Sequence, residues 1–230
     1  MECIYRSSCK KKDCDIWQDI TNNFCMRYFK IDKILDNAML SPKQRKDIKL
    51  VLDSDKSDYN SYATLNKFKE SIMNNIEDNV NLYIYSEITG NGKTSWAIKL
   101  LTEYVKKNWI NIQINSRPVL FINVPQYLLE LKLNIRSQSE YVQIVQDNFL
   151  KADLIVWDDI GTKTASDFEL EYLLSMIDNR QRLEQKIDIY TSNIIPTELQ
   201  KYVGDRLASR ILNTSQLIEF KGQDKRGLNI

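Results

Sequence analysis

The distribution of apolar residues divides the sequence into parts of different character. From Val80 onwards, apolar runs of strand length alternate with segments in which apolar residues recur at helical spacing. Such alternation is typical of βαβ units and predicts a parallel sheet of five strands, hence a three-layer α/β domain over residues 80–230. The predicted strands are Leu82–Tyr85, Val119–Val124, Leu154–Trp157, Ile187–Thr191 and Leu217–Phe220. The predicted helices are Lys93–Lys107, Pro125–Leu133, Glu140–Leu150, Asp167–Leu183 and a pair after Pro196.

The residues ahead of this domain are more polar and are expected to form two smaller regions. Apolar residues recur at helical spacing from Ile31 to Ala38, which predicts a helical linker over residues 31–79. Residues 1–30 contain all four cysteines of the chain and are expected to form a small segment of their own.

Composition and charge exclude several classes of protein. The formal net charge is +1 at pH 7, so any surface for nucleic acid must be local. The chain has no histidine, which excludes a Ser-His-Asp triad and every histidine-ligated metal site. No apolar run approaches the roughly 18 residues of a membrane span, and no apolar stretch follows the basic residues near the N-terminus. The expected location is therefore the cytoplasm, with no membrane as partner.

A glycine-bearing loop follows the first predicted strand. The loop and the start of the next helix read Thr89-Gly90-Asn91-Gly92-Lys93-Thr94-Ser95. A strand, a loop ending in Gly-Lys-Thr and a helix together predict a phosphate loop (P-loop) for ATP, and these seven residues are the candidate nucleotide-binding residues. Gly90 and Gly92 allow backbone N–H groups to converge on phosphate oxygens. Lys93 is expected to reach the β- and γ-phosphates, and the Thr94 hydroxyl to bind Mg²⁺.

One position departs from the usual phosphate-loop pattern. A glycine normally stands five residues before the glycine of the Gly-Lys pair, and here that position is Glu87. The alternative interpretation is a glycine turn at a helix start with an incidental lysine. The strand–loop–helix context favours the phosphate loop, with an altered entry turn.

Two carboxylates follow the third predicted strand. Asp158 and Asp159 come directly after the apolar run Leu154–Trp157, so they are expected at the carboxyl edge of the sheet, beside the phosphate loop. Asp158 is the candidate Mg²⁺ ligand, and Asp159 is the candidate base that orients and deprotonates the attacking water. Glutamate is commoner than aspartate at the position of Asp159 in fast ATPases, so the shorter side chain predicts slow hydrolysis of ATP. Without the phosphate loop, an ordinary turn with a capping role would be the better interpretation.

Polar residues near the C-terminus complete the candidate site. Asn193 follows the fourth predicted strand and is expected to sense the γ-phosphate, although a helix cap is the alternative. Arg206 and Arg210 lie four residues apart on one predicted helical face, suited to reach the γ-phosphate of a neighbouring subunit. A solvated basic face is the alternative for the two arginines.

Taken in order, these motifs resemble the DnaC/DnaI-type AAA+ helicase loaders, especially the versions carried by bacteriophages and prophages. The blocks that carry the resemblance are the phosphate loop, Trp157–Gly161, Tyr190–Asn193, Gly204–Ile211 and Gly222–Arg226. The resemblance covers roughly Tyr62 to the C-terminus. It implies an AAA+ ASCE core without a C-terminal lid domain, self-association into a helical or ring oligomer, Asn193 as first sensor, and Arg210 with Arg206 as arginine finger. It also implies an N-terminal domain that grips a hexameric DnaB-type replicative helicase, and a core that contacts single-stranded DNA.

The cysteines suggest a structural metal. Cys3, Cys9, Cys14 and Cys25 could hold Zn²⁺ in a segment too small for its own core. Their spacing lacks a tight Cys-x-x-Cys pair, so ordinary buried or reduced cysteines are the alternative. The resemblance supports zinc, since the DnaI branch carries an N-terminal zinc-binding module.

Three functions remain open from the sequence. The leading hypothesis is an ATP-dependent loader of a replicative helicase, of phage type. The alternatives are an IstB-like helper ATPase of DNA transposition, and an adaptor that binds nucleotide without hydrolysis and blocks or recruits a host helicase. Candidate contacts with single-stranded DNA are Lys10–Lys12, Arg27–Lys30 and Lys132–Arg136, each of which could instead be a solvated face.

Overall fold

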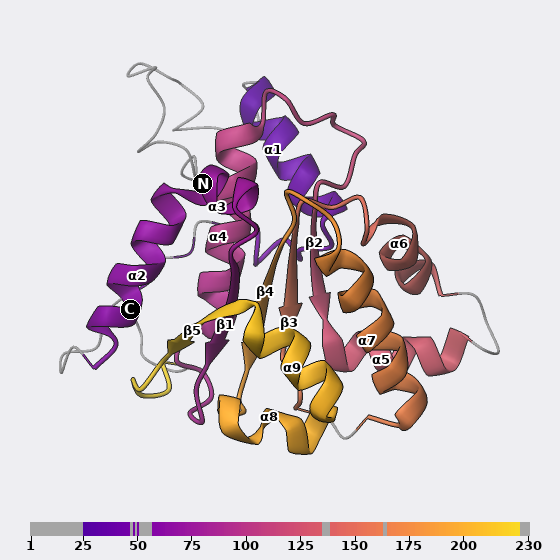
Figure 1. Cartoon of the computed structure of the whole chain (residues 1–230). Helices are drawn as coiled ribbons and strands as arrows, with labels where there is room; N and C mark the ends of the chain where they lie inside the picture. The colour runs from indigo at the N-terminus through magenta and orange to yellow at the C-terminus, as the bar shows by residue number, and fades with distance from the viewer. Residues whose placement is uncertain are drawn as a thin grey trace.

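A twisted parallel sheet forms the centre of the molecule (Figure 1). The computed structural model describes residues 25–46, 48, 50, 57–134, 139–162 and 165–225. Within them the strands are β1 (Asn81–Tyr85), β2 (Val119–Asn123), β3 (Leu154–Asp158), β4 (Ile187–Ser192) and β5 (Ser215–Glu219). Their order across the sheet is β2-β3-β4-β1-β5, and every pairing is parallel. The predicted five-stranded parallel sheet is confirmed.

Helices cover both faces of the sheet, which gives three layers (Figure 1). One face is covered by α1 (Met26–Asn37), α2 (Tyr59–Glu70), α3 (Ile72–Glu77) and α4 (Lys93–Asn108). The other is covered by α5 (Val124–Asn134), α6 (Glu140–Asn148), α7 (Asp167–Gln181), α8 (Pro196–Val203) and α9 (Asp205–Asn213). None of the helices in the described ranges is long and apolar enough to cross a membrane.

The apolar runs of the strands arise because both faces of the sheet are buried. Successive side chains of a strand point to opposite faces, so Leu82 and Ile84 join the core under α1–α4, while Tyr83 joins the core under α5–α9. The helices α1, α2 and α3 share the first core with the sheet and therefore pack as part of the α/β layers. The predicted division of the chain at residues 30 and 79 stays a prediction, and residues 1–24 lie outside the described residues.

The predicted bounds differ most at the last strand. We expected it over Leu217–Phe220, and it runs from Ser215 to Glu219. Among the described residues β5 is the strand at one edge of the sheet, beside β1, and Leu217 is 46% exposed. Because an edge strand has a solvated side, its polar residues hide the apolar periodicity on which the prediction depended.

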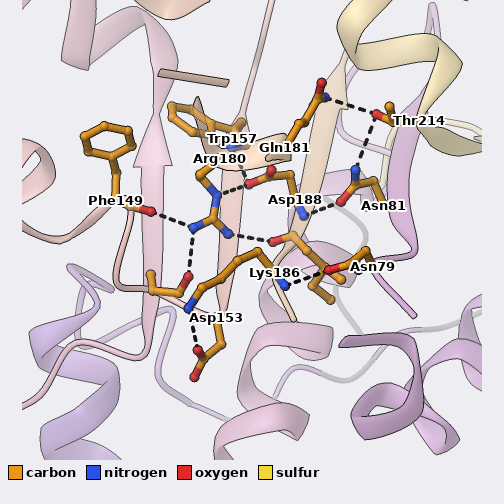
Figure 2. A network of polar contacts seen from close by, with 12 residues as sticks. Asn79, Asn81, Phe149, Asp153, Trp157, Arg180, Gln181, Lys186, Asp188 and Thr214 are labelled. Atoms are coloured by element: carbon orange, nitrogen blue, oxygen red, sulfur yellow. Dashed lines mark hydrogen bonds and ion pairs between the residues drawn. The ribbon is translucent and has the colours of Figure 1, made fainter. Parts of the chain in front are cut away.

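A buried ion pair anchors α7 to the amino edge of the sheet (Figure 2). Arg180 is fully buried, and its Nε lies 2.7 Å from Oδ1 of Asp188, near the start of β4. Its Nη1 donates to the backbone carbonyls of Phe149 and Ala152, and its Nη2 donates to that of Ile187. The Trp157 indole donates to the same Asp188 oxygen at 2.9 Å. Four of the five N–H groups of the buried guanidinium therefore have a hydrogen-bond partner in the described part of the chain.

Replacing Arg180 with Met would leave the Asp188 carboxylate buried without its cation. We expect the free energy of unfolding to fall by about 3–5 kcal/mol, measured by urea denaturation. Arg182→Met is the matched control, because Arg182 forms an exposed pair with Asp178 at 2.6 Å. An exposed pair contributes about 0–1 kcal/mol. An equally small decrease in the free energy of unfolding in both variants would contradict the anchoring role of Arg180.

Candidate nucleotide-binding site

The loop between β1 and α4 borders a cavity at the carboxyl edge of the sheet. The cavity has a volume of about 300 Å³. Its lining consists of Thr89, Gly90, Asn91, Gly92, Lys93, Thr94, Ser95, Asp159 and Asn193. The fold therefore brings all seven predicted phosphate-loop residues together with the polar residues predicted after β3 and β4.

Gly92 sets the turn from the loop into α4. Its φ angle is +105°, a left-handed conformation that residues with a Cβ rarely adopt. The helix therefore begins with its first residues on the cavity, and the first N–H groups of a helix have no carbonyl partner within it. Together with the positive end of the helix dipole, these groups suit an anion such as a phosphate.

The predicted phosphate-binding lysine is folded back into the loop. Lys93 is 5% exposed, and its ammonium donates to the Ile88 carbonyl at 3.0 Å and to Oδ1 of Asn91 at 3.3 Å. Asn91 is fully buried and donates in turn to the Ser86 hydroxyl at 2.6 Å. These neutral oxygens hold the ammonium at the loop, where a phosphate could replace them as a stronger, charged partner.

Glu87 does not obstruct the loop. Its side chain is exposed and is not part of the cavity lining. It is also not one of the residues with a positive φ angle, whereas Gly90 has a φ of +73°. The entry turn therefore needs no glycine at this position, which explains how the chain departs from the usual pattern without losing the loop.

The Asp158 carboxylate connects three segments of the site. Its Oδ1 accepts hydrogen bonds from the hydroxyls of Thr94 and Thr191, each at 2.7 Å. Its Oδ2 accepts a longer one from the Asn123 amide at 3.4 Å. These donors come from α4, β4 and β2, so the carboxylate at the end of β3 lies at the junction of all three.

The surroundings of Asp158 suit a divalent cation. Burial raises the pKa of this carboxyl above its ordinary value, although the hydrogen bonds from Thr191, Thr94 and Asn123 and the positive charge of Lys93 act in the opposite direction. These three donors are neutral, and together with the Lys93 ammonium they only partly offset the cost of burying the negative charge. A carboxylate beside a threonine hydroxyl is an oxygen donor set of the kind that Mg²⁺ prefers, so the residues present fit the predicted Mg²⁺ ligands.

Asp159 has an unusual backbone conformation. Its φ angle is +60°, which costs a residue with a side chain about 1–2 kcal/mol. Its backbone N–H donates to the Thr191 hydroxyl at 3.0 Å, and the Ile160 N–H donates to the Thr191 carbonyl at 2.9 Å. Strain of this kind concentrates at functional sites. The conformation places the Asp159 side chain, which is partly exposed, on the cavity.

The two predicted arginines lie on a different surface. Arg206 and Arg210 of α9 line an open cavity of about 520 Å³ between α7 and α9. Arg210 Nε lies 2.8 Å from Oδ1 of Asp178, and Arg206 Nη1 lies 3.9 Å from Oε1 of Glu171. Within one chain they are therefore not part of the phosphate-loop cavity, and their predicted role depends on a second subunit.

The remaining predicted sites are only partly described. Cys3, Cys9 and Cys14 lie outside the described residues, while Cys25 precedes α1 and is partly buried. The described part of the chain holds no group of three or more His, Cys, Asp or Glu that could bind a metal, so zinc stays a prediction.

The basic segments predicted to contact single-stranded DNA are described in part. Lys10–Lys12 and residues 135–138 lie outside the described residues. Lys132 pairs with the buried Glu169 at 3.1 Å, and Arg27 and Lys30 each lie 5.8 Å from the Trp109 ring centre. These lysines and this arginine therefore have structural contacts within the chain.

Two residues of the site were not predicted. Thr191 and Asn123 both donate to Asp158, and Thr191 also accepts the Asp159 N–H. A signal was available, since each is a polar residue at or near the end of a predicted apolar strand. Strand order, which the sequence does not reveal, decides that β2 and β4 are the two neighbours of β3.

Comparison with known proteins agrees with this geometry. The family model described as "IstB-like ATP binding protein" matches residues 35–227. Among curated proteins, the replicative helicase loader DnaC of Escherichia coli (strain K12) is 23% identical over 135 residues, which are 59% of this chain and 51% of DnaC. The chain thus matches about half the length of its curated relatives.

Solved structures show the same fold. The crystal structure of the DnaC helicase loader has a TM-score of 0.63 and 19% identity, covering 79% of this chain and 100% of that one. The replication initiator DnaA bound to AMPPCP and single-stranded DNA has a TM-score of 0.59 and 18% identity, covering 80% of this chain and 51% of that one. The predicted resemblance to DnaC-type AAA+ loaders is confirmed.

We expect Asp158→Asn to raise the free energy of unfolding of the nucleotide-free protein at pH 7.5, measured by urea denaturation. The amide retains an oxygen for the two threonine hydroxyls and removes a charge whose burial is only partly offset by its hydrogen bonds and by Lys93. Asp188→Asn is the matched control, because this aspartate is equally buried but is paired with Arg180, so its loss should destabilise the fold. A similar loss of stability in both variants would contradict a ligand-binding role for the Asp158 charge.

Proposed function

The chain belongs to the IstB-like ATP binding protein family, and from that premise we propose that it is an ATP-dependent loader of a hexameric replicative helicase onto single-stranded DNA. One observation carries the proposal: a single cavity joins the phosphate loop to Asp159 and Asn193, beside the Asp158–Thr94 contact, in a chain similar to a helicase loader. An origin in a phage remains a prediction.

The phosphate loop is proposed to bind the triphosphate of ATP. Backbone N–H groups from Gly90 to Thr94 would receive the phosphate oxygens. Lys93 would exchange its present partners, the Ile88 carbonyl and the Asn91 amide, for the β- and γ-phosphates. Thr94 and Asp158 would hold Mg²⁺, which when bound neutralises phosphate charge.

Hydrolysis of the bound nucleotide is assigned to two side chains on the cavity. Asp159 would orient a water molecule toward the γ-phosphate and accept its proton. Asn193 would hydrogen-bond the γ-phosphate or the same water, since it lines the cavity beside Asp159. Aspartate reaches less far than glutamate, which supports slow hydrolysis and a switch rather than a motor.

A second subunit is proposed to complete the site. Arg210 is 56% exposed and its guanidinium is held by Asp178, so it is presented on the surface in a fixed position. In a helical or ring oligomer it would reach the γ-phosphate bound to the neighbouring subunit, with Arg206 beside it. Association between subunits would then be coupled to the nucleotide that lies between them.

The proposed partners follow from the relatives. DnaC is named a replicative helicase loader, and a DnaA of the same fold is described with single-stranded DNA. By analogy, residues 1–30 would grip a DnaB-type helicase, with Cys3, Cys9, Cys14 and Cys25 on Zn²⁺, and the core would contact single-stranded DNA. The family name instead favours a transposition helper as second candidate. A non-hydrolysing adaptor is the third.

A mixing experiment tests the shared site. We expect Lys93→Ala and Arg210→Ala each to reduce ATP hydrolysis at least about a hundredfold. An equal mixture should recover part of the activity, because a wild-type loop and a wild-type Arg210 then meet at some subunit interfaces. Arg182→Ala is the matched control, since Arg182 binds the same Asp178 and should keep full activity. Mixed oligomers without recovered hydrolysis would contradict the arginine-finger assignment.

A transfer assay tests the loader itself. The full chain, a hexameric replicative helicase and closed circular single-stranded DNA are combined with ATP, and the helicase that remains on the circles is measured. We expect the wild-type chain to increase this amount severalfold and Lys93→Ala to increase it much less, because its nucleotide switch is lost. Equal helicase recovery with and without the chain would reject the loader. ATPase stimulation by transposase–DNA complexes would then favour the transposition helper.

A further inference from the structure

The segment that follows β5 contacts the phosphate loop. It contains the start of the block Gly222–Arg226, to which the proposed chemistry gives no role. The segment leaves the sheet at Phe220, whose N–H donates to the Tyr85 carbonyl at 2.8 Å. Five residues later the backbone N–H of Lys225 donates to the carbonyl of Gly90, inside the phosphate loop, at 3.0 Å. Residues 220–225, which we call the tail segment, thus extend from the end of β1 to the phosphate loop.

The start of α2 fixes the direction of the tail segment. Asp58 is 1% exposed, and its Oδ1 accepts the backbone N–H groups of Lys221 and Gly222 at 2.6 and 3.0 Å. The Ser61 hydroxyl donates to the Glu219 carbonyl at 2.5 Å. Side chains from the start of α2 therefore satisfy backbone groups just before and just after the end of β5. A buried carboxylate that accepts two backbone N–H groups is a strong restraint on a turn.

Tyr62 connects the tail segment to the start of α4. Lys225 Nζ donates to the Tyr62 hydroxyl at 2.9 Å and lies 5.1 Å from the ring centre. Tyr62 is 5% exposed and packs edge-on against Trp96 of α4, with ring centres 5.1 Å apart. Its hydroxyl lies 3.9 Å from the point where a Cβ on Gly92 would stand. Tyr62 therefore contacts both the tail segment and the glycine at which α4 begins.

The Gly90 contact has a direct consequence for phosphate binding. In a trans peptide the C=O of Gly90 and the N–H of Asn91 point in opposite directions, and the described residues contain no cis peptide bond. Lys225 holds the Gly90 oxygen, so the Asn91 N–H points the opposite way within the same peptide plane, away from Lys225. Gly90 has no Cβ and could otherwise turn its carbonyl toward the phosphates, where its partial negative charge would repel them.

We propose that Lys225 and Tyr62 are positioning residues for nucleotide binding, and that the tail segment holds the phosphate loop in its anion-binding conformation. The Lys225 backbone N–H fixes the Gly90 peptide, and its ammonium on Tyr62 keeps that N–H in place. The inference rests on the proposed function, because the phosphate loop must bind ATP for its conformation to matter.

ATP titration of the full chain by calorimetry, with Mg²⁺ present, tests the inference. Lys225→Met and Tyr62→Phe each remove one end of the contact and keep most of the packing. We expect each to weaken ATP binding about threefold to tenfold, the range of one lost hydrogen bond. The double variant should be no weaker than the weaker single variant, because both remove the same contact. Lys225→Arg keeps a cation on the tyrosine and should restore affinity.

A matched control and a stability measurement separate positioning from folding. Lys221→Met changes a lysine of the same segment that is 65% exposed and pairs with Glu219, so it should leave ATP affinity unchanged. The thermal midpoints of all variants should stay within about 4 °C of wild type, because each variant loses at most one contact and keeps the core. The positioning role would be overturned if ATP affinity fell in proportion to the thermal midpoint across the variants. It would also be overturned if the losses of ATP affinity added up in the double variant.

The wild-type titration separates a failure of the positioning role from a failure of the proposed nucleotide site. If wild type binds ATP and Lys225→Met binds it equally well, the positioning role is wrong and the proposed nucleotide site stands. If wild type itself fails to bind ATP, the proposed function fails and the inference fails with it.

Discussion

The Asp158 carboxylate is the group on which the site depends. It is 4% exposed and accepts hydrogen bonds from the start of α4, from β4 and from β2. A buried carboxylate needs such donors, and parallel strands supply them because their carboxyl ends meet at one edge of the sheet. Burial outweighs these hydrogen bonds and the attraction to Lys93, so the negative charge is retained at an energetic cost. That cost is understandable where a cation and a triphosphate are bound.

The opposite edge of the sheet uses a second buried aspartate in a different way. Asp188 lies on β4, next to the strand of Asp158, and its charge is compensated by Arg180. Arg180 anchors α7, and α7 carries Asp178, which holds Arg210 at 2.8 Å. One aspartate is thus the proposed ligand for a cation, and the other fixes the helix that carries the partner of the proposed arginine finger. The carboxyl edge of the sheet carries the proposed binding site, and the amino edge carries an ion pair that stabilises the fold.

Much of the fold could be predicted because its signals are local. Burial of both faces gives continuous apolar runs, and Gly92-Lys93-Thr94 at the start of the helix that follows a strand and a loop is typical of a phosphate loop. The unpredicted contacts join residues that are distant in the sequence. Lys225 and Tyr62 are 163 positions apart, and Thr191 reaches Asp158 only because β4 lies beside β3. The range predicted for β5 was displaced because one side of this edge strand is solvated, which weakens the apolar periodicity of its sequence.

Hydrogen–deuterium exchange of the full chain with and without Mg²⁺–ATP tests the central claim most directly. We expect slower exchange in three separate stretches, at residues 89–95, 158–161 and 191–193, because one ligand would contact all of them at the carboxyl edge. Exchange around Arg180 and Asp188, at the amino edge, should stay unchanged. Protection confined to other parts of the chain, or none at saturating ATP, would contradict the assignment of this cavity as the nucleotide site.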